Sequence, residues 1–132
     1  RFRNDVPSFN DDVQGTGAVA TACVVGAPGD RRDEDIRQAG ITMAGMFDWM
    51  IVKEDDDRRG RAEAEVAGML RESAQAAGMP AERITTILNE QEAVRYALDQ
   101  GEPKDLIVIF ADNVTAVWKE VIYYGKPEAQ NL

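Results

Sequence analysis

Apolar residues recur along the chain in two alternating patterns, short continuous runs and longer stretches with helical spacing. Short runs bounded by glycine, proline or charge predict buried strands, and the spaced pattern predicts amphipathic helices. Strands are predicted at residues 19–25, 49–53, 84–88 and 105–110, and helices at about 30–47, 62–77 and 90–100. This alternation predicts an α/β fold, with a doubly wound, mostly parallel sheet and helices on both faces.

Three details of this prediction depend on local sequence. Asp30 lies where the first helix should begin and is a residue type that caps helices. The run from Asp105 to Phe110 is the most continuous apolar segment, which is typical of a central parallel strand covered on both faces. Residues 114–124 fit either a short helix or a helix that passes into an edge strand at 121–124.

The length of 132 residues fits one domain with a single core. Residues 1–18 are polar and without periodicity, so they are predicted to form a linker or a divergent segment, followed by a domain at 19–124 and a tail at 125–132. The single cysteine, Cys23, lies in an apolar run, which predicts a buried thiol and a reducing compartment.

No apolar stretch has the length of a membrane span, and the first residues do not resemble a signal peptide, so a cytoplasmic protein is expected. The numbering starts at Arg1 rather than methionine, and we therefore expect a fragment of a larger parent.

The charge balance narrows the range of ligands. With 15 basic and 24 acidic residues the formal charge is -9, which argues against nucleic acid or an anionic membrane as partner and favours a cationic ligand. The chain has no histidine, so triad hydrolysis and a zinc site are not expected.

Two predicted strands end in dense, mixed charge. The first opens into the glycine turn and acids of residues 26–35, and the second opens into residues 54–61, which contain Glu54, Asp55, Asp56 and Asp57 followed by arginines. Because ligands of open α/β sheets gather outside the carboxyl ends of strands, these two loops predict one shared polar site.

The first loop does not have the features of a phosphate site. Its acids would repel a phosphate at the helix start, and the segment lacks the lysine and spacing of a P-loop as well as the dinucleotide fingerprint. Asp30 can also be read as a simple helix cap in solvent.

The second loop needs positive charge nearby, because four adjacent carboxylates repel one another. Its own arginines Arg58, Arg59 and Arg61, a guanidinium or ammonium ligand, or a divalent metal would each meet that need. Asp112 and Asn113 end the predicted strand at 105–110 and fit either a turn or the same crevice.

Three segments together resemble a known family. Residues 24–36, residues 53–61 and the strand at 105–110 with Trp118 and Lys119 are similar to the C-terminal domain of cyanophycin synthetases, whose corresponding half resembles Mur ligases. The resemblance covers about residues 19–124. It implies a Rossmann-like domain of an ATP-dependent amide ligase that attaches arginine to the side chains of an aspartate polymer through an acyl phosphate.

The resemblance also implies a role for the two loops, which would line the amino-acid side of the cleft. The substrate-binding residues that it implies are Asp30, Arg31, Arg32, Glu54, Asp55, Asp56, Asp57, Arg59 and Arg61. No catalytic residue, cofactor-binding residue or metal ligand is assigned, and the ATP and Mg²⁺ of the parent enzyme are expected to bind mainly outside this chain. Implied partners are arginine, the aspartate polymer and upstream ligase domains, and a homo-oligomer is left open.

Residues 1–18 contain no counterpart of the family's Asp-Tyr-Ala-His-Asn-Pro-like loop. The isolated domain is expected to be inactive, because the acyl-phosphate chemistry that the resemblance implies needs a second domain. A non-catalytic α/β binding or interaction module that kept the fold is the alternative. A phosphoacceptor receiver domain fits less well, because Gly26, Ala27 and Pro28 stand where its first acids should follow the strand.

Overall fold

Strands and helices alternate in the structure as they do in the sequence pattern. The computed structural model describes residues 2, 20–55 and 59–125. The elements are β1 (Thr21–Val25), α1 (Asp33–Met46), β2 (Trp49–Val52), α2 (Glu65–Ala76), a 3-10 turn η3 (Ala81–Arg83), β3 (Ile84–Thr86), α3 (Glu90–Gln100), β4 (Leu106–Ile109) and α4 (Val114–Ile122).

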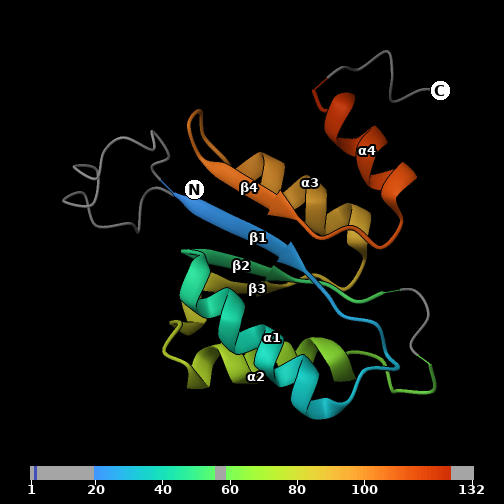
Figure 1. Ribbon diagram of the computed structural model, residues 1–132. Helices are drawn as coiled ribbons and strands as arrows, with labels where there is room; N and C mark the ends of the chain where they lie inside the picture. The colour runs from blue at the N-terminus through green and yellow to red at the C-terminus, as the bar shows by residue number, and fades with distance from the viewer. Residues whose placement is uncertain (1, 3–19, 56–58, 126–132) are drawn as a thin grey trace.

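The four strands form one parallel sheet in the order β3-β2-β1-β4 (Figure 1). Cys23 of β1 is in register with Met50 of β2 on one side and with Val108 of β4 on the other. Helices α1 and α2 cover one face, and α3 and α4 lie on the other. The predicted doubly wound α/β fold is therefore confirmed.

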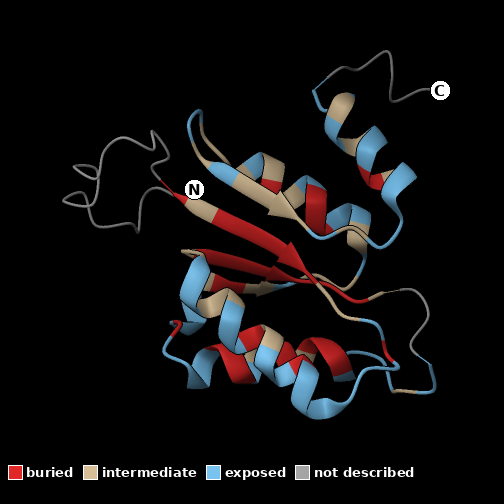
Figure 2. Cartoon of the chain, in the orientation of Figure 1, coloured by how far each residue is buried: buried red, intermediate tan, exposed pale blue. Residues whose placement is uncertain are grey.

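Each face of the sheet has its own apolar core, and Figure 2 shows both as buried bands on the strands and inner helix faces. Cys23, Val25, Met50 and Val52 join Ile36 of α1 and residues of α2 on one face. Ala22, Val24, Trp49 and Ile51 join Ala93, Val94 and Ala97 of α3 and Val117 of α4 on the other. This division follows from the two-residue period of a strand, which sends successive side chains to opposite faces.

Phe2 also belongs to the second core. Its side chain is buried, and its ring lies 5.5 Å from the ring of Trp49. The remainder of the predicted linker, residues 1 and 3–18, lies outside the described part of the chain, as does the tail beyond Gly125.

The prediction that residues 105–110 form a central strand is wrong. Among the described residues β4 pairs with β1 alone and forms an edge, whereas β1 and β2 occupy the centre. Leu106 is 50% exposed and Phe110 is 42% exposed, because α1 and α2 do not extend over this edge. The apolar run correctly predicted a strand, but it did not predict the position of that strand in the sheet.

Helix and strand ends differ from the prediction by up to three residues. Asp30 does not cap α1, because it lies in a turn and Arg32 occupies the N-cap position without a side-chain cap hydrogen bond. The third strand stops at Thr86, although the Ile87 N–H still donates to the Val52 carbonyl at 2.9 Å. Of the two options for residues 114–124, the structure has the helix, which ends at Ile122.

Candidate functional site at the carboxyl edge of the sheet

The loops that follow β1, β2 and β4 meet at the carboxyl edge of the sheet, together with the first turn of α3. This arrangement follows from the parallel topology, since parallel strands all end at the same edge. The two charged loops predicted to share a site are brought together there by hydrogen bonds and ion pairs.

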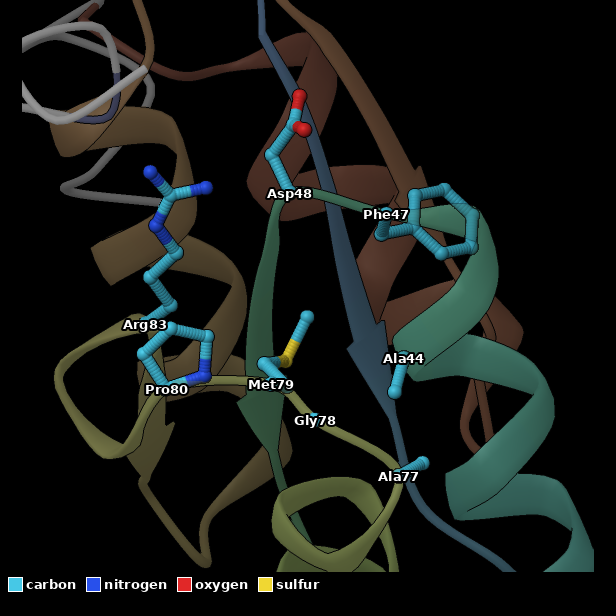
Figure 3. A pocket seen from close by; sticks show the side chains of 8 residues that line it. All are labelled: Ala44, Phe47, Asp48, Ala77, Gly78, Met79, Pro80 and Arg83. Atoms are coloured by element: carbon cyan, nitrogen blue, oxygen red, sulfur yellow. The ribbon is translucent and has the colours of Figure 1, made fainter. Parts of the chain in front are cut away.

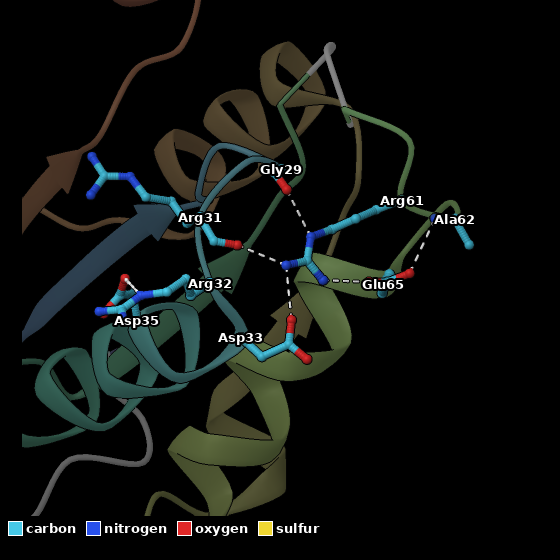
Figure 4. A network of polar contacts seen from close by, with 8 residues as sticks. All are labelled: Gly29, Arg31, Arg32, Asp33, Asp35, Arg61, Ala62 and Glu65. Atoms are coloured by element: carbon cyan, nitrogen blue, oxygen red, sulfur yellow. Dashed lines mark hydrogen bonds and ion pairs between the residues drawn. The ribbon is translucent and has the colours of Figure 1, made fainter.

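Arg61 joins the second loop to the first (Figure 4). Its guanidinium donates to the carbonyl oxygens of Gly29 and Arg31 at 2.8 and 2.7 Å, and it forms an ion pair of 2.8 Å with Asp33. It also pairs with Glu65 at the start of α2. A guanidinium has five N–H groups in a fixed plane, so one side chain can satisfy carbonyls and carboxylates at once. Arg61 therefore fixes the β1 loop against the start of α2.

The other predicted arginines have different partners. Arg59 lies 3.8 Å from the Asp30 carboxylate, which adds a second and longer link between the loops. Arg32 forms ion pairs with Glu34 and Asp35 of α1. Among the described residues, its side chain forms no ion pair with the loop after β2. The backbone carbonyl of Arg31 accepts from Arg61, while its side chain extends away from that guanidinium in Figure 4.

A second polar cluster lies beneath the loops around the ammonium of Lys53. The Lys53 side chain is 1% exposed, and its Nζ lies 3.3 Å from Oδ1 of Asp55 and 3.0 Å from Oε2 of Glu90. Glu90 in turn accepts hydrogen bonds from the backbone N–H groups of Asp112 and Asn113. The cluster thus connects the ends of β2 and β4 to the start of α3.

The pKa values of the two acids in this cluster, Asp55 and Glu90, are shifted in opposite directions. Burial raises the pKa of Asp55, with Asp112 and Glu90 adding to the effect against the opposing ammonium of Lys53. Burial also works to raise the pKa of Glu90, but the Asp112 and Asn113 N–H groups and Lys53 together hold it below its ordinary value. Glu90 is therefore held as the anion, whereas Asp55 is the more readily protonated partner.

Glu54 faces the interior, away from the open side of the loops. Its residue exposure is 8%, one carboxylate oxygen accepts from the Ala64 N–H at 3.0 Å, and the other is buried without a partner. Ala64 has a positive φ of 68°, so Glu54 supports an unusual turn before α2. Asp56 and Asp57 lie outside the described residues.

Gly26 allows the β1 and β2 strand ends to approach each other. A Cβ at this position would lie 3.1 Å from the Lys53 carbonyl oxygen and 3.3 Å from Oδ1 of Asp55. The glycine after β1 therefore makes room for the Lys53 cluster, in addition to starting the turn.

The predicted site residues did not include Lys53 and Glu90, or Asp33 and Glu65, which pair with Arg61. The signal for Lys53 was present, since a lysine directly after a continuous apolar strand has to bury its ammonium or redirect it. Glu90 gave no such signal, because an acid in the first turn of a helix is commonplace. Its role depends on the neighbouring position of β4, which no local pattern reports.

A separate hollow lies at the opposite, amino end of the strands (Figure 3). Its volume is about 210 Å³, and it is lined by Ala44, Phe47, Asp48, Ala77, Gly78, Met79, Pro80 and Arg83. The Asp48 carboxylate accepts from the Thr21 N–H at 2.9 Å and from the Thr21 hydroxyl at 3.1 Å. Asp48 thus fixes the start of β1, and the hollow is not part of the charged edge.

Two further features bear on cofactors and membranes. Across residues 20–55 and 59–125, no three acidic or cysteine side chains form a set that would hold a metal ion. The acids in the first turn of α1, Asp33, Glu34 and Asp35, would repel a nucleotide phosphate placed at that helix end. None of the described helices has the length and apolar character that a membrane span requires.

The fold and the edge define an α/β domain that presents charged loops where parallel sheets bind their ligands. A family model described as Mur ligase, glutamate ligase domain, matches residues 13–113. This match covers more than half of the chain, and the chain belongs to that family. The Mur-ligase-like fold expected from the sequence motifs is thus confirmed.

Curated relatives agree with the motif-based resemblance. The chain is 46% identical to a cyanophycin synthetase of Crocosphaera subtropica over 92 residues, which are 70% of the chain and 10% of that relative. It is 46% identical to a cyanophycin synthetase of Synechocystis sp. over 109 residues, or 79% of the chain and 12% of the relative. A cyanophycin synthetase of Trichormus variabilis is 40% identical over 102 residues, or 77% of the chain and 11% of the relative. The chain therefore spans about a tenth of the length of these relatives.

Proposed function

We propose that this chain acts as the C-terminal domain of an ATP-dependent amide ligase similar to cyanophycin synthetase. In this proposal it helps to position the incoming amino acid, arginine, for attack on an acyl phosphate of an aspartate side chain. ATP and Mg²⁺ would bind mainly to other parts of the parent enzyme, in agreement with a described edge that offers neither a phosphate cradle nor a metal set.

The observation that carries the proposal is the joining of two acid-rich loops at the carboxyl edge. Arg61 and the Arg59–Asp30 pair hold the loop after β1 to the loop after β2, so Asp30 and Asp33 lie against the arginines of the second loop. Of the described acids of that second loop, Glu54 is buried and Asp55 keeps part of its side chain exposed. The names of the relatives support the ligase class, and the contacts between the two loops support the proposed location of the site.

The edge has the chemistry to receive a cationic amino acid. Asp30 is 54% exposed and meets its arginine only at 3.8 Å, and the Asp55 side chain keeps 15% exposure beside the buried Lys53. Carboxylates bind guanidinium and ammonium groups through charge-assisted hydrogen bonds, which set the direction of the bound group as well as its affinity. A domain that fixes an amine in this way contributes by proximity, because orientation of the nucleophile lowers the entropic part of the barrier.

Steady-state kinetics of the full-length ligase test the proposal. We expect Asp30→Asn and Asp55→Asn each to raise the KM for arginine about tenfold, because one charged hydrogen bond is lost, and to leave the KM for ATP nearly unchanged. Glu63→Gln, an exposed acid of the same region, is the matched control and should change neither constant. Equal effects on the two KM values would overturn the assignment.

One observation favours a second function, a binding or interaction module without a ligase site. Arg59 and Arg61 already engage Asp30 and Asp33, so part of the acidic surface is neutralised from within. Calorimetric titration of the parent enzyme with arginine, lysine and aspartate separates the two functions. The ligase assignment requires binding of arginine that Asp30→Asn weakens, and the module requires the absence of amino-acid binding.

A further inference from the structure

The Asp55 carboxylate is held at one oxygen and open at the other. Its Oδ1 lies 3.3 Å from the ammonium of Lys53, whereas its Oδ2 receives no hydrogen bond or ion pair from the described part of the chain. The side chain keeps 15% exposure. Because each carboxylate oxygen accepts hydrogen bonds, Asp55 retains acceptor capacity for a ligand.

Gly26 defines the place of this carboxylate between the ends of β1 and β2. A Cβ at Gly26 would lie 3.3 Å from Oδ1 of Asp55 and 3.3 Å from Cγ of Lys53. The carboxylate and the lysine stem therefore lie directly over the glycine, where parallel sheets bind their ligands.

Lys53 is itself fixed from behind by Glu90. The lysine side chain is 1% exposed, and its Nζ lies 3.0 Å from Oε2 of Glu90, whose side chain is 9% exposed. Glu90 accepts hydrogen bonds from the backbone N–H groups of Asp112 and Asn113 at 2.5 and 2.9 Å. Because backbone groups have no rotamers to change, Glu90 has a defined position, and through Lys53 so does Asp55.

We infer that Lys53 and Glu90 are positioning residues for Asp55, whose free carboxylate oxygen accepts a hydrogen bond from the cationic part of the incoming amino acid. The chain of contacts from the end of β4 through Glu90 and Lys53 sets the direction of Asp55 before the amino acid arrives. A side chain ordered in advance loses less conformational entropy on binding than a mobile one. This inference rests on the proposed function and adds two residues to the same amino-acid site.

The charges around Asp55 give this arrangement a pH signature. Burial raises the pKa of Asp55, and the ammonium of Lys53 at the end of β2 opposes the rise. The carboxylates of Asp112 after β4 and Glu90 on α3 add to the rise, and the neighbour at the end of β1, Gly26, has no charge. Lys53→Met should therefore raise the pKa of Asp55 further, whereas Glu90→Gln should lower it.

The affinity of the full-length ligase for arginine, measured by calorimetric titration from about pH 4.5 to about pH 7, tests the signature. No ionisable group of arginine titrates in this range, so a loss of affinity on acidification reports protonation of the site. We expect this loss to occur at higher pH in Lys53→Met than in the parent enzyme, and at lower pH in Glu90→Gln. Two variants that only loosened the fold would not move the loss in opposite directions.

Steady-state kinetics of the double variant Lys53→Met/Glu90→Gln separate positioning from folding. Neutral groups of similar size often replace both members of a buried ion pair without loss of stability, so the melting temperature should stay within about 3 °C of the parent. The KM for arginine should nevertheless rise about fivefold, while kcat and the KM for ATP stay nearly unchanged. The same changes at exposed positions, Lys119→Met/Glu92→Gln, are the matched control and should alter none of these values.

An arginine KM at the parent value in the double variant would show that the pair acts in stability alone and would overturn the inference. Shifts of the pH dependence in the same direction in Lys53→Met and Glu90→Gln would overturn it as well. Asp55→Asn separates the two levels of failure. If this variant leaves the KM for arginine unchanged, the proposed function and the inference both fail, and if it raises that KM while the double variant does not, the inference alone fails.

Discussion

The ammonium of Lys53 explains much of the local chemistry at the carboxyl edge. An isolated charge that is 1% exposed would be costly, and Asp55 and Glu90 offset that cost from two sides. The same two carboxylates would repel each other without the lysine. Each of the three groups therefore depends on the others, and removal of one leaves a buried charge without its partner.

Replacement of Glu90 by alanine should lower the free energy of unfolding by about 2–3 kcal/mol at neutral pH. The variant removes one of the two partners of Lys53 and the acceptor of the Asp112 and Asn113 N–H groups. Urea unfolding of the 132-residue chain measures the change. Glu92→Ala, at an exposed acid two residues further along α3, should stay within about 0.5 kcal/mol of the parent. A similar small loss for Glu90→Ala would show that the buried cluster does not stabilise the fold.

The contribution of Glu90 to the free energy of unfolding should also depend on pH. The direction of its pKa shift determines whether that contribution grows or falls as the pH is lowered. The folded state holds the pKa of Glu90 below its ordinary value of about 4.5, so the carboxylate stabilises the fold above that pH and loses this contribution as the pH falls through the folded value. The contribution of Asp55 to stability changes with pH in the opposite direction, because its raised pKa favours the protonated form in the folded state. The gap between the parent and Glu90→Ala should therefore narrow as urea unfolding is repeated from about pH 7 down to about pH 3.

Cys23 should be inert in the folded protein. Burial raises the pKa of its thiol to about 12, and the side chain is fully buried at the centre of the sheet. Because the thiolate is the reactive species, alkylation by iodoacetamide near pH 8 should be at least about a hundredfold slower than for the urea-unfolded chain. Mass spectrometry of quenched samples gives both rates, and rapid labelling without denaturant would contradict the buried position.

At the scale of elements, the contact between α1 and α2 depends on Gly40. A Cβ at this position would lie 2.0 Å from the Ser73 hydroxyl oxygen and 2.6 Å from the Leu70 carbonyl oxygen. Gly40→Ala should lower the free energy of unfolding by about 2 kcal/mol, because the overlap with backbone outweighs a helix-propensity gain of at most about 1 kcal/mol.

Gly45 is the matched control, since a Cβ there meets nothing within 4 Å on the same helix. Gly45→Ala should raise the stability by about 0.5 kcal/mol. Thermal unfolding of both variants separates close packing from propensity, and stabilisation by both would remove the packing argument.

Arg61 should control the order of the loop after β1. In Arg61→Lys a single ammonium replaces a planar group that reaches two carbonyls and two carboxylates, so it cannot keep all four contacts. Hydrogen exchange of the amides at residues 28–33 should quicken, while the amides of β1 stay protected. Arg37→Lys, whose side chain pairs with Glu72 on exposed helix faces, should leave this loop unchanged. Unchanged exchange in Arg61→Lys would show that the loop is ordered by other contacts.

The sequence predicted those helices and strands that are determined by the local pattern of apolar residues. The period of apolar residues located the four strands and helices α1, α2 and α3 of the described chain, and it identified α3 with the bounds that the structure has. The start of α1 was missed by three residues, because Asp30 has the chemistry of a cap but its carboxylate turns to Arg59 across the loop. Capping propensity is a local preference, and here a contact from a distant segment overrides it.

At the scale of the whole molecule, the sequence did not predict the features that depend on where a strand lies in the sheet. The apolar run at 105–110 reads as central because both of its faces are apolar, yet β4 is an edge in the described sheet. The convergence of the two charged loops was predictable, since parallel topology alone requires it. The partners within that edge were not, because the Lys53–Glu90 pair joins segments that only the strand order brings together.

The excess of acidic residues makes the stability of the whole molecule depend on salt, through repulsion that no single ion pair accounts for. The formal charge of -9 produces repulsion over the whole surface, whereas exposed pairs such as Arg37–Glu72 each contribute at most about 1 kcal/mol. Raising NaCl from about 10 to about 150 mM shortens the screening length from about 30 to about 8 Å and weakens both effects.

We expect the repulsion to dominate at neutral pH, so the melting temperature should rise by a few degrees over this range of salt. Near pH 4.5, the isoelectric point calculated from the sequence, the net charge vanishes and the rise should disappear or change sign. Calorimetry at both pH values measures the difference. A salt-induced rise of equal size at the two pH values would indicate ion exclusion from the surface rather than screening of the acidic charge.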